Sequence, residues 1–92
     1  MTVLRFERLL PAPDAGGELD QVAVRAVDEM RRRGALWAEA ARSEEGLIVL
    51  SEWRDASALE AWEASDEGLR FVRDRDVLLG SDATTRRFDG IQ

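Results

Sequence analysis

The chain contains no cysteine, histidine, tyrosine, lysine or asparagine. Without cysteine it can form no disulfide, thiolate nucleophile or zinc–thiolate site. Without histidine, tyrosine and lysine it has no imidazole base or metal ligand, no phenol donor and no amine for a Schiff base. Any proton transfer must therefore use an aspartate, a glutamate or a base on the substrate itself. We expect no metal and no other cofactor.

The charge balance is acidic, and long apolar runs are missing. All thirteen basic residues are arginine, nineteen residues are acidic, and the net charge is −6. This excess of negative charge disfavours binding to nucleic-acid phosphates. No stretch approaches the roughly 18 apolar residues of a membrane span, and charges interrupt residues 1–10, where a signal peptide would be apolar. We expect one domain over residues 1–92, located in the cytoplasm, with no nucleic-acid or membrane partner.

The hydrophobic pattern predicts four strands and two helices in the order βαββαβ. Strands are indicated by two-residue alternation or apolar runs, and helices by three- and four-residue spacing. The predicted elements are strand 3–10, helix 18–33, strand 35–42, a strand through 47–53, a helix from residue 56 and strand 83–89. Asp55 stands at the N-cap position of the second helix. Ser65 to Gly68 resembles a further N-cap, so we expect this helix to be broken or restarted there.

This order predicts an α+β, ferredoxin-like fold, with a four-stranded antiparallel sheet and two helices on one face. The helix-free face then carries Leu4, Phe6, Ile48 and Leu50, and nothing else in the chain is available to cover them. Packing of a second copy, sheet against sheet, would bury these side chains. We therefore expect a homodimer.

One segment carries a family resemblance. Glu52-Trp53 is followed after four residues by Ala58-Leu59, then at two-residue intervals by Trp62 and Ser65. This order resembles the antibiotic biosynthesis monooxygenase family, small dimeric α/β-barrel proteins that include cofactor-free oxygenases and haem-degrading enzymes. The resemblance implies a ligand pocket between the second helix and the sheet, lined by the strand tryptophan, here Trp53. Haem degradation is disfavoured, because that branch uses a histidine and this chain has none.

The two-residue strand period places Val49 and Ser51 on the same face as Trp53, with Trp62 opposite them. Residues expected to bind the substrate are Arg5, Trp37, Glu39, Val49, Ser51, Trp53, Trp62 and Phe71. The alternative is that Trp53, Trp62 and Phe71 are ordinary core aromatics, since aromatic side chains dominate core burial.

Glu7 and Arg86 are the candidate catalytic residues. The resemblance places Glu7 where haem-degrading members carry an asparagine, and a carboxylate in an apolar pocket can act as a general base. Arg86 would handle charge on the substrate. Equally, Glu7 can be a structural ion-pair partner of Arg5, Arg86 or Arg87, and Glu39 has the same ambiguity.

The function expected from the resemblance is binding of an aromatic or polyketide-like small molecule, with cofactor-independent monooxygenation in secondary metabolism as the favoured reaction. Two alternatives stay open. One is a non-redox cyclase or isomerase that uses a carboxylate base. The other is a non-catalytic ligand-binding or regulatory module, because fold alone does not determine function.

Overall fold

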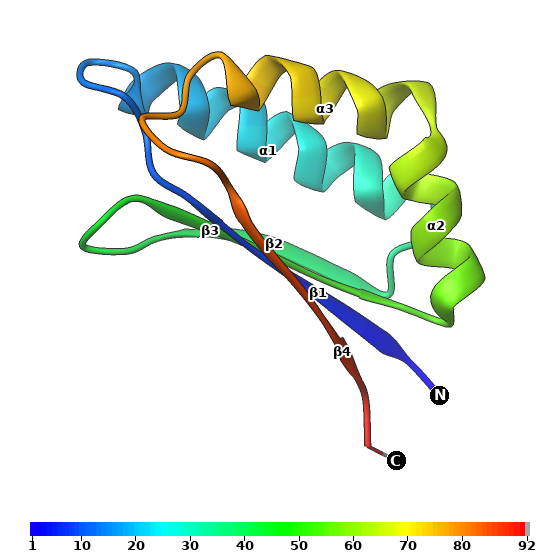
Figure 1. The fold of residues 1–92 in the computed structure, drawn as a ribbon. Helices are drawn as coiled ribbons and strands as arrows, with labels where there is room; N and C mark the ends of the chain where they lie inside the picture. The colour runs from blue at the N-terminus through cyan, green and yellow to red at the C-terminus, as the bar shows by residue number, and fades with distance from the viewer. Residues whose placement is uncertain (92) are drawn as a thin grey trace.

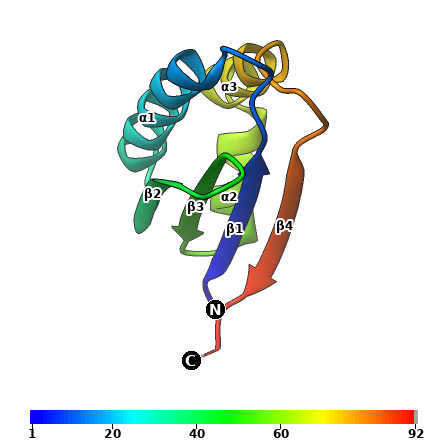
Figure 2. The ribbon, with the colours of Figure 1, turned by 90° about the vertical axis from the view of Figure 1, so that its left-hand side faces the viewer.

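The computed structural model describes residues 1–91. Its four strands form one antiparallel sheet in the order β2-β3-β1-β4, and the helices cover one face of this sheet (Figures 1 and 2). The elements are β1 (Val3–Leu9), α1 (Gly16–Arg32), β2 (Trp37–Arg42), β3 (Leu47–Trp53), α2 (Ala56–Ala64), α3 (Asp66–Asp76) and β4 (Thr84–Asp89). The predicted ferredoxin-like fold is confirmed, with three helices instead of two because the second predicted helix is divided.

The division falls at Ser65, where the sequence predicts it. The Ser65 hydroxyl accepts a hydrogen bond from the Gly68 backbone N–H at 3.0 Å and donates one to the Trp62 carbonyl at 2.6 Å. Its extended backbone ends α2, and its side chain caps the first turn of α3. Asp55 caps α2 in the same way, accepting from the Ala58 N–H at 2.9 Å.

Gly68 at this junction leads to the first prediction. A Cβ atom at Gly68 would lie 2.1 Å from the Trp62 carbonyl oxygen, which is backbone and cannot rotate away. We expect Gly68→Ala to lower the free energy of unfolding by at least about 2 kcal/mol through overpacking. Gly17→Ala is the matched control in α1, because nothing lies within 4 Å of its added Cβ. Urea unfolding should show the control to be neutral or slightly stabilising, and a neutral Gly68→Ala would contradict the packing described here.

The core lies between the sheet and the helices. The strands alternate as predicted, so that the inward side chains of β1 and β3 are buried and their outward neighbours are half-buried or exposed. The inner face of α1 supplies Leu19, Ala23, Ala26, Val27 and Met30. Gly34 follows this helix in the left-handed region, φ 103°, which favours glycine and ends the helix where expected.

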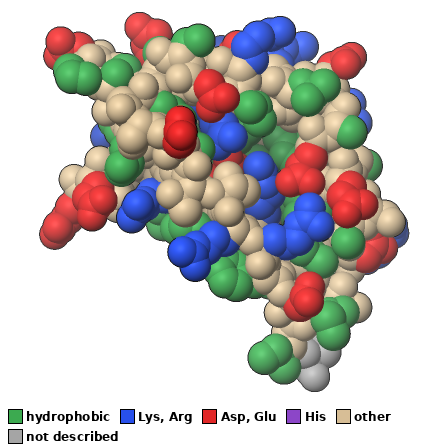
Figure 3. All heavy atoms as spheres, in the orientation of Figure 1, with side chains coloured by type: hydrophobic (Ala, Val, Ile, Leu, Met, Phe, Trp, Pro, Cys, Tyr) green, Lys and Arg blue, Asp and Glu red, His purple; other side chains and the backbone are tan. Residues whose placement is uncertain are grey.

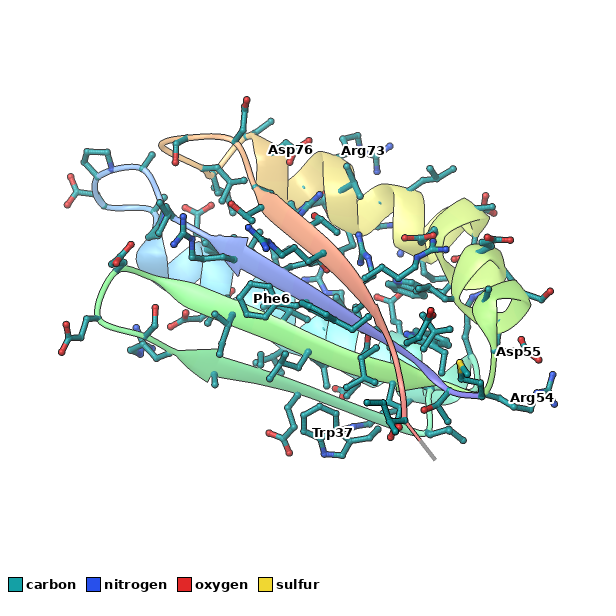
Figure 4. All side chains as sticks on the ribbon, turned by 60° about the horizontal axis from the view of Figure 1, so that its bottom comes forward. Phe6, Trp37, Arg54, Asp55, Arg73 and Asp76 are labelled. Carbon is teal, nitrogen blue, oxygen red and sulfur yellow. The ribbon has the colours of Figure 1, made fainter. Side chains whose placement is uncertain are left out.

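The opposite face of the sheet has no cover within the chain. Leu4, Phe6, Ile48 and Leu50 are only half-buried there. Trp37 and Phe88 are 44% and 50% exposed. Figure 4 shows Phe6 and Trp37 on this face, turned away from the helices. We call this surface the outer sheet face. Within residues 1–91 no helix has the length and apolar character needed to cross a membrane.

Candidate functional site

A buried ion cluster lies between the sheet and α3. The Glu7 side chain is 1% exposed. Its Oε1 accepts a hydrogen bond from Arg5 Nη1 at 2.7 Å, and its Oε2 accepts one from Arg75 Nη1 at 2.5 Å. Both guanidinium groups are themselves buried, with 8% of each side chain exposed. One carboxylate thus holds two cations inside the protein, where an unpaired charge is costly.

Local structure explains why these three residues meet. The two-residue period of β1 turns Arg5 and Glu7 to the same inner face. On α3, Gly68, Phe71 and Arg75 are spaced by three and four residues and form the buried stripe of the helix. The Arg75 guanidinium lies 5.4 Å from the centroid of the Phe71 ring, an arrangement that favours a cation.

The ion cluster continues toward the surface as a line of alternating charges. Arg5 Nε lies 3.2 Å from Glu63 Oε2, and Glu63 Oε1 accepts from Arg87 Nη2 at 3.0 Å. Arg87 also lies 3.5 Å from Glu60. Exposure rises along this line, from a sealed Glu7 to a largely exposed Glu60. The inner members therefore interact in a poorly solvated environment, whereas the outer pair is screened by water.

The environment of Glu7 suits proton transfer. Burial raises the pKa of the Glu7 carboxyl above its ordinary value of 4.5, opposed by the positive charges of Arg5 and Arg75. A carboxylate with a raised pKa is a stronger base than a solvated one. Two guanidinium groups beside it can stabilise negative charge that develops on a substrate. Guanidinium groups do not ligate metals, and no group of three or more acidic side chains in residues 1–91 is placed to hold a metal ion.

The predicted aromatic residues lie on the same inner side but fill the core. Trp53 and Trp62 are 0% and 2% exposed, and their rings stack with centroids 6.2 Å apart and planes 21° apart. Trp53 Nε1 donates to Ser51 Oγ at 2.9 Å. The stacked rings occupy the space between α2 and β3 where the resemblance implies a pocket. The packing of these two rings is that of core aromatics, the alternative interpretation given in the sequence analysis.

The strand register brings other predicted residues to the ion cluster. Val49 pairs opposite Glu7, and Ser51 pairs opposite Arg5, so both belong to the inner face beside it. Phe71 is buried and packs under Arg75. The structure therefore brings together Arg5, Glu7, Val49, Ser51, Trp53, Trp62 and Phe71 on the inner side of the sheet.

The opening toward this region lies at the end of α3. A hollow of about 490 Å³ is lined by Arg75, Asp76 and the segment 79–83, which leads into β4. In the orientation of Figure 1, acidic and basic side chains gather around a hollow between α3 and β4 (Figure 3). Because Arg75 both lines the hollow and binds Glu7, it links the opening to the buried carboxylate.

Three predicted site residues lie on the other side of the sheet. Arg86 pairs opposite Phe6, Glu39 opposite Leu50, and Trp37 opposite Glu52, so all three side chains belong to the outer sheet face. Neighbouring residues of a strand point to opposite faces of the sheet. Arg86 lies between the inward-facing Thr85 and Arg87, so its side chain points away from Glu7. Of the three alternative ion-pair partners predicted for Glu7, the structure shows Arg5 in that role. Arg86 lies on the outer sheet face, and Arg87, the inner arginine of β4, pairs with Glu60 and Glu63 instead.

Arg75 is the member of the ion cluster that the sequence analysis missed. Its side chain is buried, yet it lies in a strongly charged stretch, Arg73-Asp74-Arg75-Asp76, that is typical of a solvated helix end. One signal was available: Arg75 follows Phe71 by four residues and Gly68 by seven, so it continues the inner stripe of the helix. An arginine in an apolar stripe indicates a buried counter-charge.

Taken together, the connectivity and the buried ion cluster define a small α+β protein with a ferredoxin-like sheet and a charged site beneath its helices. The family model for antibiotic biosynthesis monooxygenase matches residues 3–74, and the chain belongs to that family. The resemblance seen in the sequence is confirmed. A search of curated proteins finds no match.

Solved structures show the same fold at low sequence identity. Rv0793 from Mycobacterium tuberculosis superposes with a TM-score of 0.91 at 20% identity, over 100% of this chain and 97% of the other. SnoaB, a cofactor-independent oxygenase from Streptomyces nogalater, superposes with a TM-score of 0.85 at 17% identity, over 99% of this chain and 94% of the other. At these identities the similarity establishes the fold.

Proposed function

We propose that this protein binds an aromatic or polyketide-like small molecule and oxygenates it without a cofactor. The observation that carries the proposal is Glu7, a buried carboxyl with a raised pKa between two guanidinium groups, one of which lines an open hollow. Family membership and the fold shared with SnoaB support a monooxygenase-like, small-molecule-binding protein. The reaction and the substrate class are our inference.

The chemistry would begin with proton removal. The substrate enters the hollow at Arg75, and movement of this side chain exposes Glu7, which takes a proton from an acidic C–H group. The resulting carbanion is stabilised by the positive charges of Arg75 and Arg5. It then reduces O₂: for a methylene group flanked by aromatic rings, CH₂ and O₂ become C=O and H₂O. The substrate supplies all four electrons, so no external reductant is needed.

We also propose that the active form is a homodimer joined through the outer sheet face. This face is apolar at its centre, and Glu39 and Arg86 lie at its two edges in register with Leu50 and Phe6. Sheet-on-sheet packing would bury the apolar centre and leave the charged edges near solvent. In this proposal Trp37, Glu39 and Arg86 belong to the subunit interface and not to the substrate site.

Oxygen uptake with an anthrone or a quinol tests the reaction. We expect Glu7→Gln, which keeps the shape and removes the charge, to reduce turnover by about 10²–10⁴-fold with substrate binding retained. A base must be deprotonated to act, so wild-type kcat/KM should rise with pH through a pKa above 4.5, and Glu7→Gln should lack this limb.

Glu60→Gln is the matched control, because Glu60 is the exposed member of the same line of charges. It should leave turnover unchanged. Oxygen uptake by Glu7→Gln at the wild-type rate would contradict the proposal. A Glu7-dependent isomerisation or cyclisation without oxygen uptake would instead support the non-redox alternative, which needs the same base.

A further inference from the structure

A second hollow lies on the helical layer, away from Glu7 and its ion cluster. Its volume is about 350 Å³, and it is lined by Arg25, Glu29, Arg32, Arg33, Glu67 and Arg70. All six residues come from α1 and α3 or, for Arg33, from the C-cap of α1. Four guanidinium groups and two carboxylates give this hollow a local charge of +2, in a chain whose net charge is −6. We call it the arginine hollow.

Three of the four arginines of this hollow have no ion-pair partner within the described part of the chain. Among residues 1–91, Arg25, Arg32 and Arg70 form no side-chain hydrogen bond or ion pair, and the one other arginine of this kind is Arg86. Acidic residues outnumber arginines in this protein, so partners are abundant elsewhere. Three unpaired cations gathered in one concavity indicate a place for an external anion.

Two acidic residues, Glu29 and Glu67, also line the arginine hollow. Arg33 donates to Glu67 Oε2 through Nε at 2.9 Å and through Nη2 at 2.6 Å, which ties the end of α1 to the first turn of α3. Glu29 lies between Arg25 and Arg32 on α1, and its Oε2 is buried with no hydrogen-bond partner among the described residues. Glu29 reduces the positive potential of the hollow without neutralising it.

The spacing of the three unpaired arginines indicates what kind of anion they can bind. Arg25 and Arg32 are seven residues apart on one side of α1, which places their Cα atoms about 10 Å apart along the helix axis. Arg70 approaches from α3, across the groove between the helices. A single compact anion can meet one or two of these groups, whereas a ligand with two neighbouring anionic groups can meet all three. Guanidinium groups bind phosphate oxygens with good geometry.

We propose that the arginine hollow binds a compact polyanion of the diphosphate type. The site is independent of the proposed oxygenase chemistry, because it lies on α1 and on the first half of α3, whereas the hollow beside Glu7 lies at the end of α3. It also lies on the helical layer, so a homodimer joined through the outer sheet face would leave it open.

Isothermal titration calorimetry with inorganic pyrophosphate and inorganic phosphate tests this proposal on the full chain. We expect saturable binding of one pyrophosphate per chain, at least about ten-fold tighter than phosphate because a second phosphoryl group is held. Arg25→Gln and Arg70→Gln should each weaken pyrophosphate binding at least about ten-fold. Glu29→Gln should tighten it several-fold, because it removes a negative charge from the hollow at constant shape.

Arg86→Gln is the matched control, because Arg86 is equally unpaired but lies on the outer sheet face. It should leave pyrophosphate affinity unchanged. Absence of saturable binding at millimolar pyrophosphate would overturn the proposal. Equal weakening by Arg86→Gln would also overturn it, since the effect would then follow net charge and not this hollow. All four positions are on the surface or half-buried, so circular dichroism can confirm that each variant folds before it is titrated.

Discussion

Replacing Glu7 by leucine is expected to lower the free energy of unfolding by about 3–5 kcal/mol. The substitution leaves Arg5 and Arg75 buried without their shared counter-charge, because both hydrogen-bond to this one carboxylate. Other acidic groups approach these guanidinium groups only at Nε: Glu63 lies 3.2 Å from Arg5 Nε, and Asp76 lies 3.5 Å from Arg75 Nε. Urea unfolding at neutral pH measures the effect.

A double-mutant cycle separates the ion pair from simple packing. The double variant Glu7→Leu with Arg75→Met replaces both partners by apolar side chains, and we expect it to be more stable than Glu7→Leu alone by at least about 1 kcal/mol. Glu45→Leu serves as the control, because Glu45 lies 3.9 Å from Arg8 in an exposed pair and should change stability by no more than about 0.5 kcal/mol. If the two single losses simply added, Glu7 and Arg75 would not be coupled as the structure shows.

Replacing Ile48 by glutamate is expected to abolish the proposed homodimer. Ile48 lies on the outer sheet face beside Ala41 and Arg8, in the apolar band that continues through Leu50 and Phe6. A carboxylate placed there would be removed from water by the second copy, and this desolvation would cost several kcal/mol even with the half-exposed Arg8 beside it. Sedimentation or light scattering at micromolar concentration should show a dimer for the wild type and a monomer for Ile48→Glu.

Val77→Glu is the control for added charge at an apolar residue, because Val77 is 79% exposed and lies at the end of α3, away from the outer sheet face. It should remain dimeric. Ile48→Leu should also remain dimeric, since it conserves volume and polarity. A stable monomeric wild type would show that the outer sheet face is not a subunit interface.

Local patterns were sufficient to predict much of this fold. The alternation of β1 placed Arg5 and Glu7 on one face and Leu4 and Phe6 on the other, as observed. The signal at Ser65 located the division between α2 and α3, because a capping hydroxyl acts on backbone groups only three residues away. These predictions succeeded because short-range hydrogen bonding and side-chain periodicity are encoded within a few neighbouring residues.

The site was harder to predict because it depends on the register of the strands and on which side of each helix packs against the sheet. For Arg86 and Arg87, a shift of one residue decides between the outer sheet face and the ion cluster, and the weak pattern of this polar strand does not indicate its register. The same ambiguity placed Trp37 and Glu39 with Trp53, whereas β2 pairs with β3 so that they face outward.

By itself, the sequence determined the order of the elements, the two faces of β1 and β3, the helix caps and the absence of histidine, cysteine and lysine chemistry. Only the tertiary structure decided that Arg75, 68 residues from Glu7 along the chain, binds its carboxylate, and that Trp53 and Trp62 stack in the core. The physical reason is the distance along the sequence over which each interaction acts. Capping and periodicity act between neighbours, whereas a buried ion pair and an aromatic stack arise when distant segments pack and exclude water.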